Sequence, residues 1–304
     1  MTYNKLLYFT ENYMNTKDFC LAVFITAIWG LNFSVIKIGL SSLEPFMLTG
    51  LRFLLCAIPL IFFIKKPDMP MLQVALYGIL FGVGLWGMVI LGIYFGISAG
   101  IASLALQMSA FFTVIMGVAL LGEKIDKVKI LGFILAVLGL FLIISITDGS
   151  VTYLGLFLIL VGALSWSCAN VVVKKSGAAR IFSLMIWSSL FSPIPLFALA
   201  YLTQGQEVFA NFLSHLDNNA VFSILFQVYP TTLFGYWIWN SLINKYHISK
   251  VAPLSLLVPI FGLLGSFVIF NENIGIEKII ACILIVGGLL LSTFSNKLMQ
   301  LKKI

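Results

Sequence analysis

The residue best suited to chemistry in this sequence is Arg52, which interrupts the apolar run GLRFLL at residues 50–55. A charge at the centre of a membrane costs about 3 kcal/mol on insertion scales, so such residues usually face a partner or a wet cavity. A guanidinium binds a carboxylate through two parallel hydrogen bonds, which makes Arg52 a candidate anchor for a substrate carboxylate. In the alternative interpretation, Arg52 is structural and pairs with Glu44 or with backbone carbonyl groups.

Two asparagines occupy similar apolar surroundings. Asn32 lies in the stretch AIWGLNFSVIK, and Asn170 lies in the related stretch LSWSCANVVVKK. Each amide could contact a ligand, or it could hydrogen-bond to a neighbouring helix, which is a common use of asparagine in membranes. Lys37 ends the first stretch, where its ammonium could bind a ligand or reach the membrane surface.

Other polar residues interrupt the later apolar runs. Gln107 shares a helix face with Ser103, and Ser255 lies between two prolines that leave backbone groups without partners. Residues 227–240 carry too many polar groups for a helix that faces lipid. The predicted substrate-binding residues are Asn32, Arg52, Trp86, Gln107, Asn170, Tyr236 and Ser255. The predicted structural or gating residues are Trp29, Lys37, Glu44, Trp166, Pro253 and Pro259.

The elements that position these residues must lie in a membrane. The chain has 304 residues, of which 61% are hydrophobic and 10% are charged, whereas a soluble domain has about 25% charged residues. Ten apolar runs are long enough to cross a bilayer, and we therefore predict an all-α polytopic membrane protein. The predicted spans are 19–38, 45–64, 71–96, 100–121, 128–147, 153–173, 181–202, 219–243, 250–270 and 276–296.

The basic residues predict how these spans are oriented. If the spans are correct, fifteen of the 18 lysine and arginine residues fall on the side of the membrane that carries both termini. Lysine and arginine accumulate on the cytoplasmic side, so both termini are predicted to be cytoplasmic. The net charge of +7 therefore orients the chain in the lipid bilayer, and no nucleic-acid partner is predicted.

The same five-span unit occurs twice. Trp29 and Lys37 align with Trp166 and Lys174, and later matches follow in the same order. Because five is odd, the second unit must enter the membrane from the opposite side, which gives an inverted repeat. The predicted divisions are a cytoplasmic lead-in (1–17), a first repeat (18–150), a second repeat (151–297) and a basic tail (298–304).

The motifs WGLNF at 29–33, GLRF at 50–53, GIASLALQ at 100–107, SWSCANVVVKK at 165–175 and VAPLSLLVP at 251–259 carry a family resemblance. With them the chain resembles the EamA-type transporters of the drug/metabolite transporter superfamily over residues 18–296. This resemblance implies ten helices, alternating access and export of small amino-acid-like metabolites, such as O-acetylserine and cysteine, across the bacterial inner membrane.

Departures from the family pattern at residues 81–92 and 226–240 leave the substrate open. The alternative is a carrier of the same fold for other amino acids, or for uptake of S-adenosylmethionine or a nucleoside-like compound. A coupling proton stays open as a partner, although no carboxylate lies at the centre of a span. The sequence contains neither a HExxH metal motif nor a P-loop, so we predict no metal, no cofactor and no enzymatic activity.

Overall fold

The computed structural model describes residues 14–122, 125–176, 180–246 and 248–301. In this part of the chain all regular structure is helical, and ten helices are long and apolar enough to cross a membrane. This confirms the predicted fold class. The observed spans are Thr16–Gly39, Pro45–Phe62, Met71–Tyr94, Ala99–Leu120, Lys127–Ile144, Tyr153–Ser176, Ile181–Gln204, Asn218–Lys245, Ala252–Phe270 and Ile276–Phe294.

Several spans are divided into shorter helical elements. The first half contains α1 (Thr16–Gly39), α2 (Pro45–Ala57), η1 (Leu60–Phe62), α3 (Met71–Gly78), η2 (Ile79–Gly87), α4 (Met88–Tyr94), α5 (Ala99–Ala105), α6 (Met108–Leu121) and α7 (Lys127–Ile144). The second half contains α8 (Tyr153–Ser176), α9 (Ile181–Ser188), α10 (Pro193–Gln204), α11 (Glu207–Ala210), α12 (Phe212–His215), α13 (Asn218–Phe226), η3 (Gln227–Phe234), α14 (Gly235–Lys245), α15 (Ile248–Val251), η4 (Ala252–Leu257), α16 (Val258–Phe270) and α17 (Ile276–Leu301).

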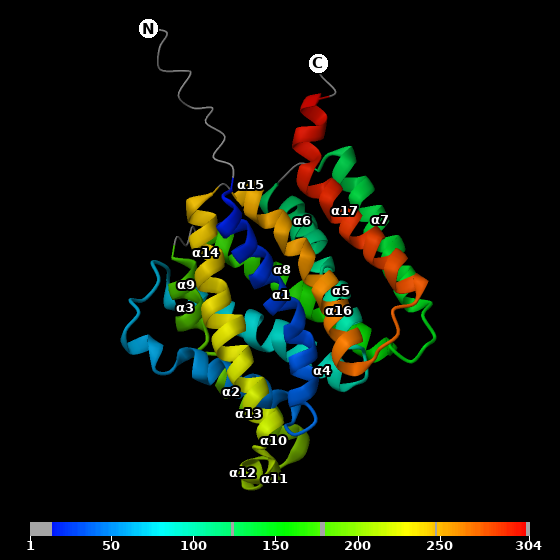
Figure 1. The fold of residues 1–304 in the computed structure, drawn as a ribbon. Coiled ribbons are helices and arrows are strands. Elements are labelled where there is room, and N and C mark those ends of the chain that lie inside the picture. The colour runs from blue at the N-terminus through cyan, green and yellow to red at the C-terminus, as the bar shows by residue number, and fades with distance from the viewer. Residues whose placement is uncertain (1–13, 123–124, 177–179, 247, 302–304) are drawn as a thin grey trace.

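The helices form one bundle with two distinct ends (Figure 1). We call the end where α1 begins and α17 finishes the proximal end, and the opposite end the distal end. Helix α1 runs from the proximal to the distal end, whereas its counterpart α8 runs in the reverse direction. The two five-helix halves are therefore inverted with respect to each other, as the odd number of spans in each repeat predicts.

The last helix of each half packs against the other at one edge of the bundle. Helices α7 and α17 lie side by side there (Figure 1). A Cβ atom at Gly132 would lie 2.4 Å from the Gly288 carbonyl oxygen, and one at Gly288 would lie 2.3 Å from the Gly132 carbonyl oxygen. Only glycine at both positions permits this approach, which brings the two backbones into direct van der Waals contact.

The third helix of each half widens into a π-helix in its middle. These segments are η2 in the first half and η3 in the second half. Pro230 lies inside η3, where its ring is incompatible with regular α-helical hydrogen bonding, and the wider π turn accommodates it. Segment η2 contains three glycines, which favour an irregular backbone. Because π-helical turns occur often at functional sites, these two segments direct attention to the side chains between them.

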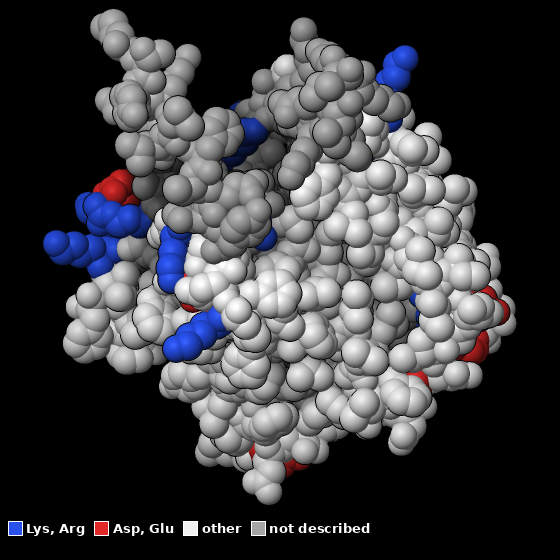
Figure 2. Space-filling model, turned by 45° about the horizontal axis from the view of Figure 1, so that its top comes forward, with Lys and Arg blue, Asp and Glu red and all other residues white. Residues whose placement is uncertain are grey.

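On the face of the bundle that Figure 2 shows, charged side chains of the described residues are unevenly distributed. Figure 2, with the proximal end turned toward the viewer, shows lysine and arginine side chains around that end and a broad surface without charge below it. Large hydrophobic side chains such as Phe62, Leu72 and Phe157 are more than 60% exposed on the described surface. A surface of this kind is expected where lipid tails are the solvent.

Candidate functional site

Arg52 is fully buried in the middle of α2, between the two π-helical segments. Its Nε and Nη2 atoms donate hydrogen bonds to the Thr232 hydroxyl at 3.2 Å and 3.0 Å, and Nη1 donates to Gln227 Oε1 at 3.4 Å. Both acceptors belong to η3. The face of the guanidinium is covered by the Trp86 ring of η2, whose centroid lies 4.1 Å from Cζ.

The two acceptors are themselves held in place. The Thr232 hydroxyl donates to the Gln227 carbonyl oxygen at 2.7 Å, and Gln227 Nε2 donates to Ser223 Oγ at 3.0 Å. Ser223 in turn donates to the Val35 carbonyl oxygen of α1 at 2.7 Å. A continuous chain of hydrogen bonds therefore runs from α2 through η3 and α13 to α1.

The cation of Arg52 has neutral acceptors only. Within the described part of the chain, no carboxylate lies within ion-pair distance of its guanidinium. Glu44, the partner considered from the sequence, instead caps the N-terminus of α2, where it accepts a hydrogen bond from the Met47 amide at 2.7 Å. A buried charge without a counter-ion is costly, and here the described partners of the guanidinium are the oxygens of Thr232 and Gln227 and the ring of Trp86.

Two buried N–H donors lie in the same region without a partner among the described residues. They are Trp86 Nε1 and Asn32 Nδ2. Trp86 stacks on Arg52, and Asn32 Oδ1 accepts a hydrogen bond at 3.1 Å from Thr231, which is the neighbour of Thr232 in η3. Because buried polar groups are nearly always hydrogen-bonded, these donors indicate that the site can accept a further acceptor.

Aromatic rings close the site on its proximal side. Trp29 donates from Nε1 to the Thr231 carbonyl oxygen at 3.0 Å, and its ring lies 5.3 Å from that of Tyr236 and 5.0 Å from that of Trp239. The Tyr236 ring also meets the edge of Phe81 of η2 at 6.1 Å. These contacts join α1, η2 and α14 into an aromatic layer beside Arg52.

The structure thus brings four of the seven predicted substrate-binding residues, Asn32, Arg52, Trp86 and Tyr236, to the region between α1, α2, η2 and η3. The other three lie on different elements. Gln107 is part-buried at the break between α5 and α6, and Asn170 is exposed on α8 and donates to Thr113 at 3.3 Å. Ser255 lies in η4, where its hydroxyl donates to the Ala252 carbonyl oxygen.

The prolines and Trp166 have positions that follow from their chemistry. Pro253 and Pro259 stand in the first turns of η4 and α16, where a missing N–H costs no intrahelical hydrogen bond. Together they mark a change from 3₁₀ to α geometry within the ninth span. Trp166 is part-buried against the core on α8.

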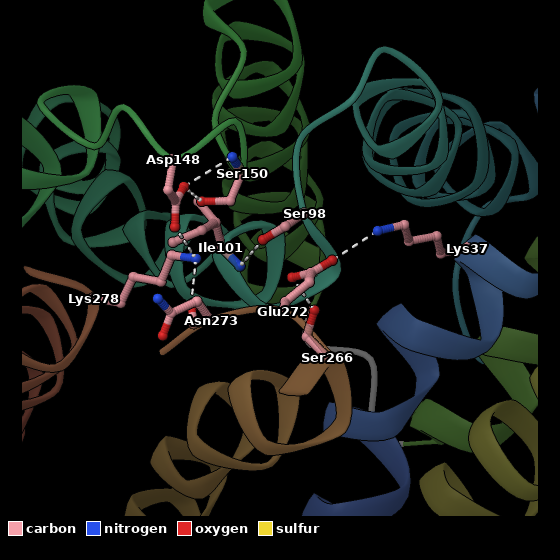
Figure 3. Close-up of polar contacts among 9 residues, drawn as sticks. All are labelled: Lys37, Ser98, Ile101, Asp148, Ser150, Ser266, Glu272, Asn273 and Lys278. Carbon is pink, nitrogen blue, oxygen red and sulfur yellow. Dashed lines mark hydrogen bonds and ion pairs between the residues drawn. The ribbon is translucent and has the colours of Figure 1, made fainter. Parts of the chain in front are cut away.

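A second polar cluster lies at the distal end (Figure 3). Lys37 of α1 forms an ion pair with Glu272 at 2.7 Å, and the Ser266 hydroxyl donates to the other carboxylate oxygen of Glu272. Lys278 of α17 is 3% exposed and donates to Asp148 at 2.7 Å and to the Asn273 carbonyl oxygen at 2.7 Å. Each of these ion pairs joins the first half of the chain to the second.

Asp148 is firmly ionised in this cluster. Burial raises the pKa of its carboxyl group, but hydrogen bonds from Lys278 and from Ser150 outweigh that effect and lower the pKa to about 2. The carboxyl group of Asp148 is therefore ionised at neutral pH, where it accepts from Lys278.

The sequence did not single out Gln227 and Thr232 as site residues. The sequence does show many polar residues around Pro230, and these predict that part of the eighth span faces a cavity and not lipid. They do not identify which of these residues contact Arg52. Likewise, Lys37 has a partner, Glu272, that lies 235 positions further along the chain. Neither contact can be derived from local spacing.

Comparison with known proteins places this arrangement in a family. The model of the EamA-like transporter family matches two segments, residues 17–145 and 153–294. A probable amino-acid metabolite efflux pump of Escherichia coli K12 is 37% identical over 287 residues, which cover 92% of this chain and 96% of the relative. The protein of the same description from Salmonella typhimurium is 35% identical, with 96% of this chain and 99% of the relative covered.

Solved structures support the same fold. One crystal structure superposes with a TM-score of 0.61 at 16% sequence identity, covering 92% of this chain and 97% of the other. At that identity the likeness concerns the fold alone.

Proposed function

The chain belongs to the EamA-like transporter family, and on that premise we propose that it exports small amino-acid metabolites, such as O-acetylserine and cysteine, from the cell. Two relatives that match nearly the whole chain are described as probable amino-acid metabolite efflux pumps. The protein is a multi-pass protein of the bacterial inner membrane. Its proximal end is proposed to face the cytoplasm, because the lysine and arginine residues concentrate there.

The buried guanidinium of Arg52 is the observation that carries the substrate class. Its two acceptors are neutral, and two further buried donors nearby, Trp86 Nε1 and Asn32 Nδ2, have no partner among the described residues. A site that is rich in donors and carries an uncompensated positive charge favours an anionic acceptor. A substrate carboxylate supplies one, and the aromatic rings beside it suit the small remainder of an amino-acid metabolite.

The contacts between the two halves support alternating access. At the distal end the halves are joined by Lys37–Glu272 and Lys278–Asp148. At the proximal end, Asp18 pairs with Lys245 at 2.6 Å, and Asp68 pairs with Arg180 at 2.7 Å. Arg52 is fully buried between these two layers, which supports the proposal that a substrate bound there is shielded from both sides at one stage of transport. In the proposed cycle, the ion pairs at one end separate when the carrier opens to that side.

Counterflow in liposomes tests this function. Purified protein is reconstituted into liposomes loaded with unlabelled O-acetylserine, and labelled O-acetylserine is added outside. We expect accumulation of label well above that of protein-free liposomes, and we expect external cysteine to compete. Cysteamine, which is cysteine without its carboxylate, should not compete.

Two results would contradict the proposal in different ways. If labelled O-acetylserine does not accumulate above the protein-free background, the proposed substrate is wrong. If cysteamine competes as well as cysteine, the carrier does not recognise the carboxylate, and the role assigned to Arg52 is wrong.

A further inference from the structure

We infer that Gln227 and Thr232 of η3 are positioning residues that occupy the donors of Arg52 until the substrate carboxylate displaces them. This inference rests on the proposed function, because it assumes that a carboxylate binds Arg52. It adds that binding exchanges one partner of the guanidinium for another. Substrate binding would then release η3 from α2.

The geometry of the hydrogen bonds supports an exchange of this kind. Thr232 takes two of the five guanidinium N–H groups and Gln227 takes one. Both Nη atoms, which a carboxylate would bind side by side, are therefore engaged by neutral oxygens. A carboxylate that approached the same edge would compete with Gln227 and Thr232 for these donors.

The strengths of the two kinds of hydrogen bond set the direction of the exchange. A bidentate pair between arginine and a carboxylate joins two ions, and such bonds are roughly twice as strong as neutral ones. The contact from Nη1 to Gln227 is 3.4 Å long, which is at the limit for a hydrogen bond. Gln227 and Thr232 therefore supply hydrogen bonds to the guanidinium, but a carboxylate, which binds it more strongly, can displace them.

The position of η3 gives the exchange a consequence for transport. Arg52 belongs to the first half and η3 to the second, so these hydrogen bonds cross the interface between the two repeats. Segment η3 is π-helical and contains Pro230, which makes its local geometry easier to change than that of a regular helix. A ligand shifts a conformational equilibrium only through its different affinity for the two states. Replacement of the η3 acceptors by the carboxylate provides that difference.

Gln227→Glu is the decisive variant, because it places a permanent carboxylate beside Arg52. The measurements are the thermal midpoint of the purified protein, the dissociation constant for O-acetylserine from ligand-induced thermal shifts, and counterflow. We expect Gln227→Glu to raise the substrate-free thermal midpoint and to weaken binding by roughly tenfold or more, since the internal anion replaces the substrate.

Thr232→Val tests the same exchange from the other side. It removes the main neutral acceptor, so we expect a lower midpoint without substrate and tighter binding of O-acetylserine, by roughly tenfold. Thr49→Val is the matched control, because Thr49 is equally buried on α2 but donates only to the Pro45 carbonyl oxygen of its own helix. It should leave the dissociation constant unchanged.

The outcomes separate this inference from the proposed function. Gln227→Met is the reference for this comparison, because it also loses the hydrogen bond from Gln227 to Ser223 but carries no carboxylate. A midpoint of substrate-free Gln227→Glu below that of Gln227→Met would overturn the exchange without reference to any substrate. Weaker binding by Thr232→Val would also overturn it, because a merely structural threonine loses stability and affinity together. If Gln227→Glu is stabilised but wild-type protein shows no shift with O-acetylserine, the exchange stands and the proposed substrate is wrong.

Discussion

Two buried cations of this protein, Arg52 and Lys278, have opposite surroundings. Arg52 lies at mid-bundle and is held by a hydroxyl and an amide oxygen, whereas Lys278 lies at the distal end and is held by a carboxylate and a backbone carbonyl oxygen. Both are almost completely removed from solvent. The charge of Lys278 is compensated within the protein, and the charge of Arg52 is not.

The difference indicates which cation is available to a ligand. The charge of Lys278 is already paired with the carboxylate of Asp148, so a further anion would have to compete with that carboxylate. Lys37 follows the same rule at the distal end through its pair with Glu272. An arginine that keeps neutral acceptors only, beside two orphaned donors, is a site that a carboxylate completes. Substitutions of the two cations and their partners should therefore affect different properties.

The largest effect is expected from Arg52→Gln. Loss of the charged hydrogen bonds should weaken substrate binding by roughly 10- to 100-fold, while the thermal midpoint should hold or rise, because an uncompensated buried charge has been removed. Arg52→Lys should lie between the two, since it keeps the charge and loses the bidentate geometry. Substrate titration and thermal unfolding of the same preparations measure both effects. A fall in midpoint that parallels the fall in affinity would show that Arg52 is structural.

The opposite pattern is expected from Asp148→Asn. Lys278 would then be buried without a counter-ion, and we expect a loss of about 1 to 3 kcal/mol in unfolding free energy, reduced from the value for a fully buried pair because Asp148 is 37% exposed. Affinity for substrate should change less than about twofold. The double variant Asp148→Asn with Lys278→Met should recover part of the stability. If the double variant is less stable than the single one, the unpaired lysine is not the cause.

The features that the sequence predicted are those set by the membrane itself. Lipid requires long apolar helices, and the translocation machinery sorts lysine and arginine, so the ten spans and the inversion of the halves could be read from apolar runs and basic clusters. Arg52 and Asn32 could be found because a polar side chain inside an apolar run must face either a ligand site or a polar group on a neighbouring helix.

The partners of these residues could not be predicted. Thr232 lies 180 positions from Arg52, and the match is made by a π-helical turn that a pattern of apolar spacing does not reveal. Asn170 shows the converse problem. The internal repeat places Asn170 one residue beyond Ala169, which is the counterpart of Asn32. One residue turns a helical side chain by about 100°. Asn32 and Ala169 are therefore both fully buried, whereas Asn170 is exposed.

A smaller effect is expected from Glu272→Gln. Its partner Lys37 has a side chain that is 36% exposed, so solvent screens the ion pair and its loss should cost about 1 kcal/mol or less. Comparison of thermal midpoints at low and high salt measures this, because wild type should lose its small advantage over Glu272→Gln as salt rises. An effect as large as that of Asp148→Asn would mean that the exposure of the lysine left unpaired, 36% for Lys37 and 4% for Lys278, does not determine the loss of stability.

The smallest effect concerns two carboxyl groups at the distal end whose pKa values are shifted in opposite directions. Burial raises the pKa of Glu44 above its ordinary value of 4.5, against the effect of hydrogen bonds from the Met47 and Phe46 amides. Its contribution to stability is therefore fully present below pH 4.5 and is lost as the pH rises through the raised pKa. Asp148 has its pKa lowered from 3.8 to about 2, so its contribution is present above pH 3.8 and is lost as the pH falls toward 2.

Thermal midpoints of wild type, Glu44→Gln and Asp148→Asn, measured from pH 3 to pH 8, separate the two carboxylates. Glutamine keeps an oxygen that can accept from the Met47 amide, so Glu44→Gln removes the titration while retaining the helix cap. The advantage of wild type over Glu44→Gln should shrink as the pH rises, and its advantage over Asp148→Asn should shrink only in the most acidic samples. If both differences in midpoint changed in the same direction with pH, the contrast would be wrong. That contrast is between Asp148, which is paired with Lys278, and Glu44, which accepts only from backbone amides.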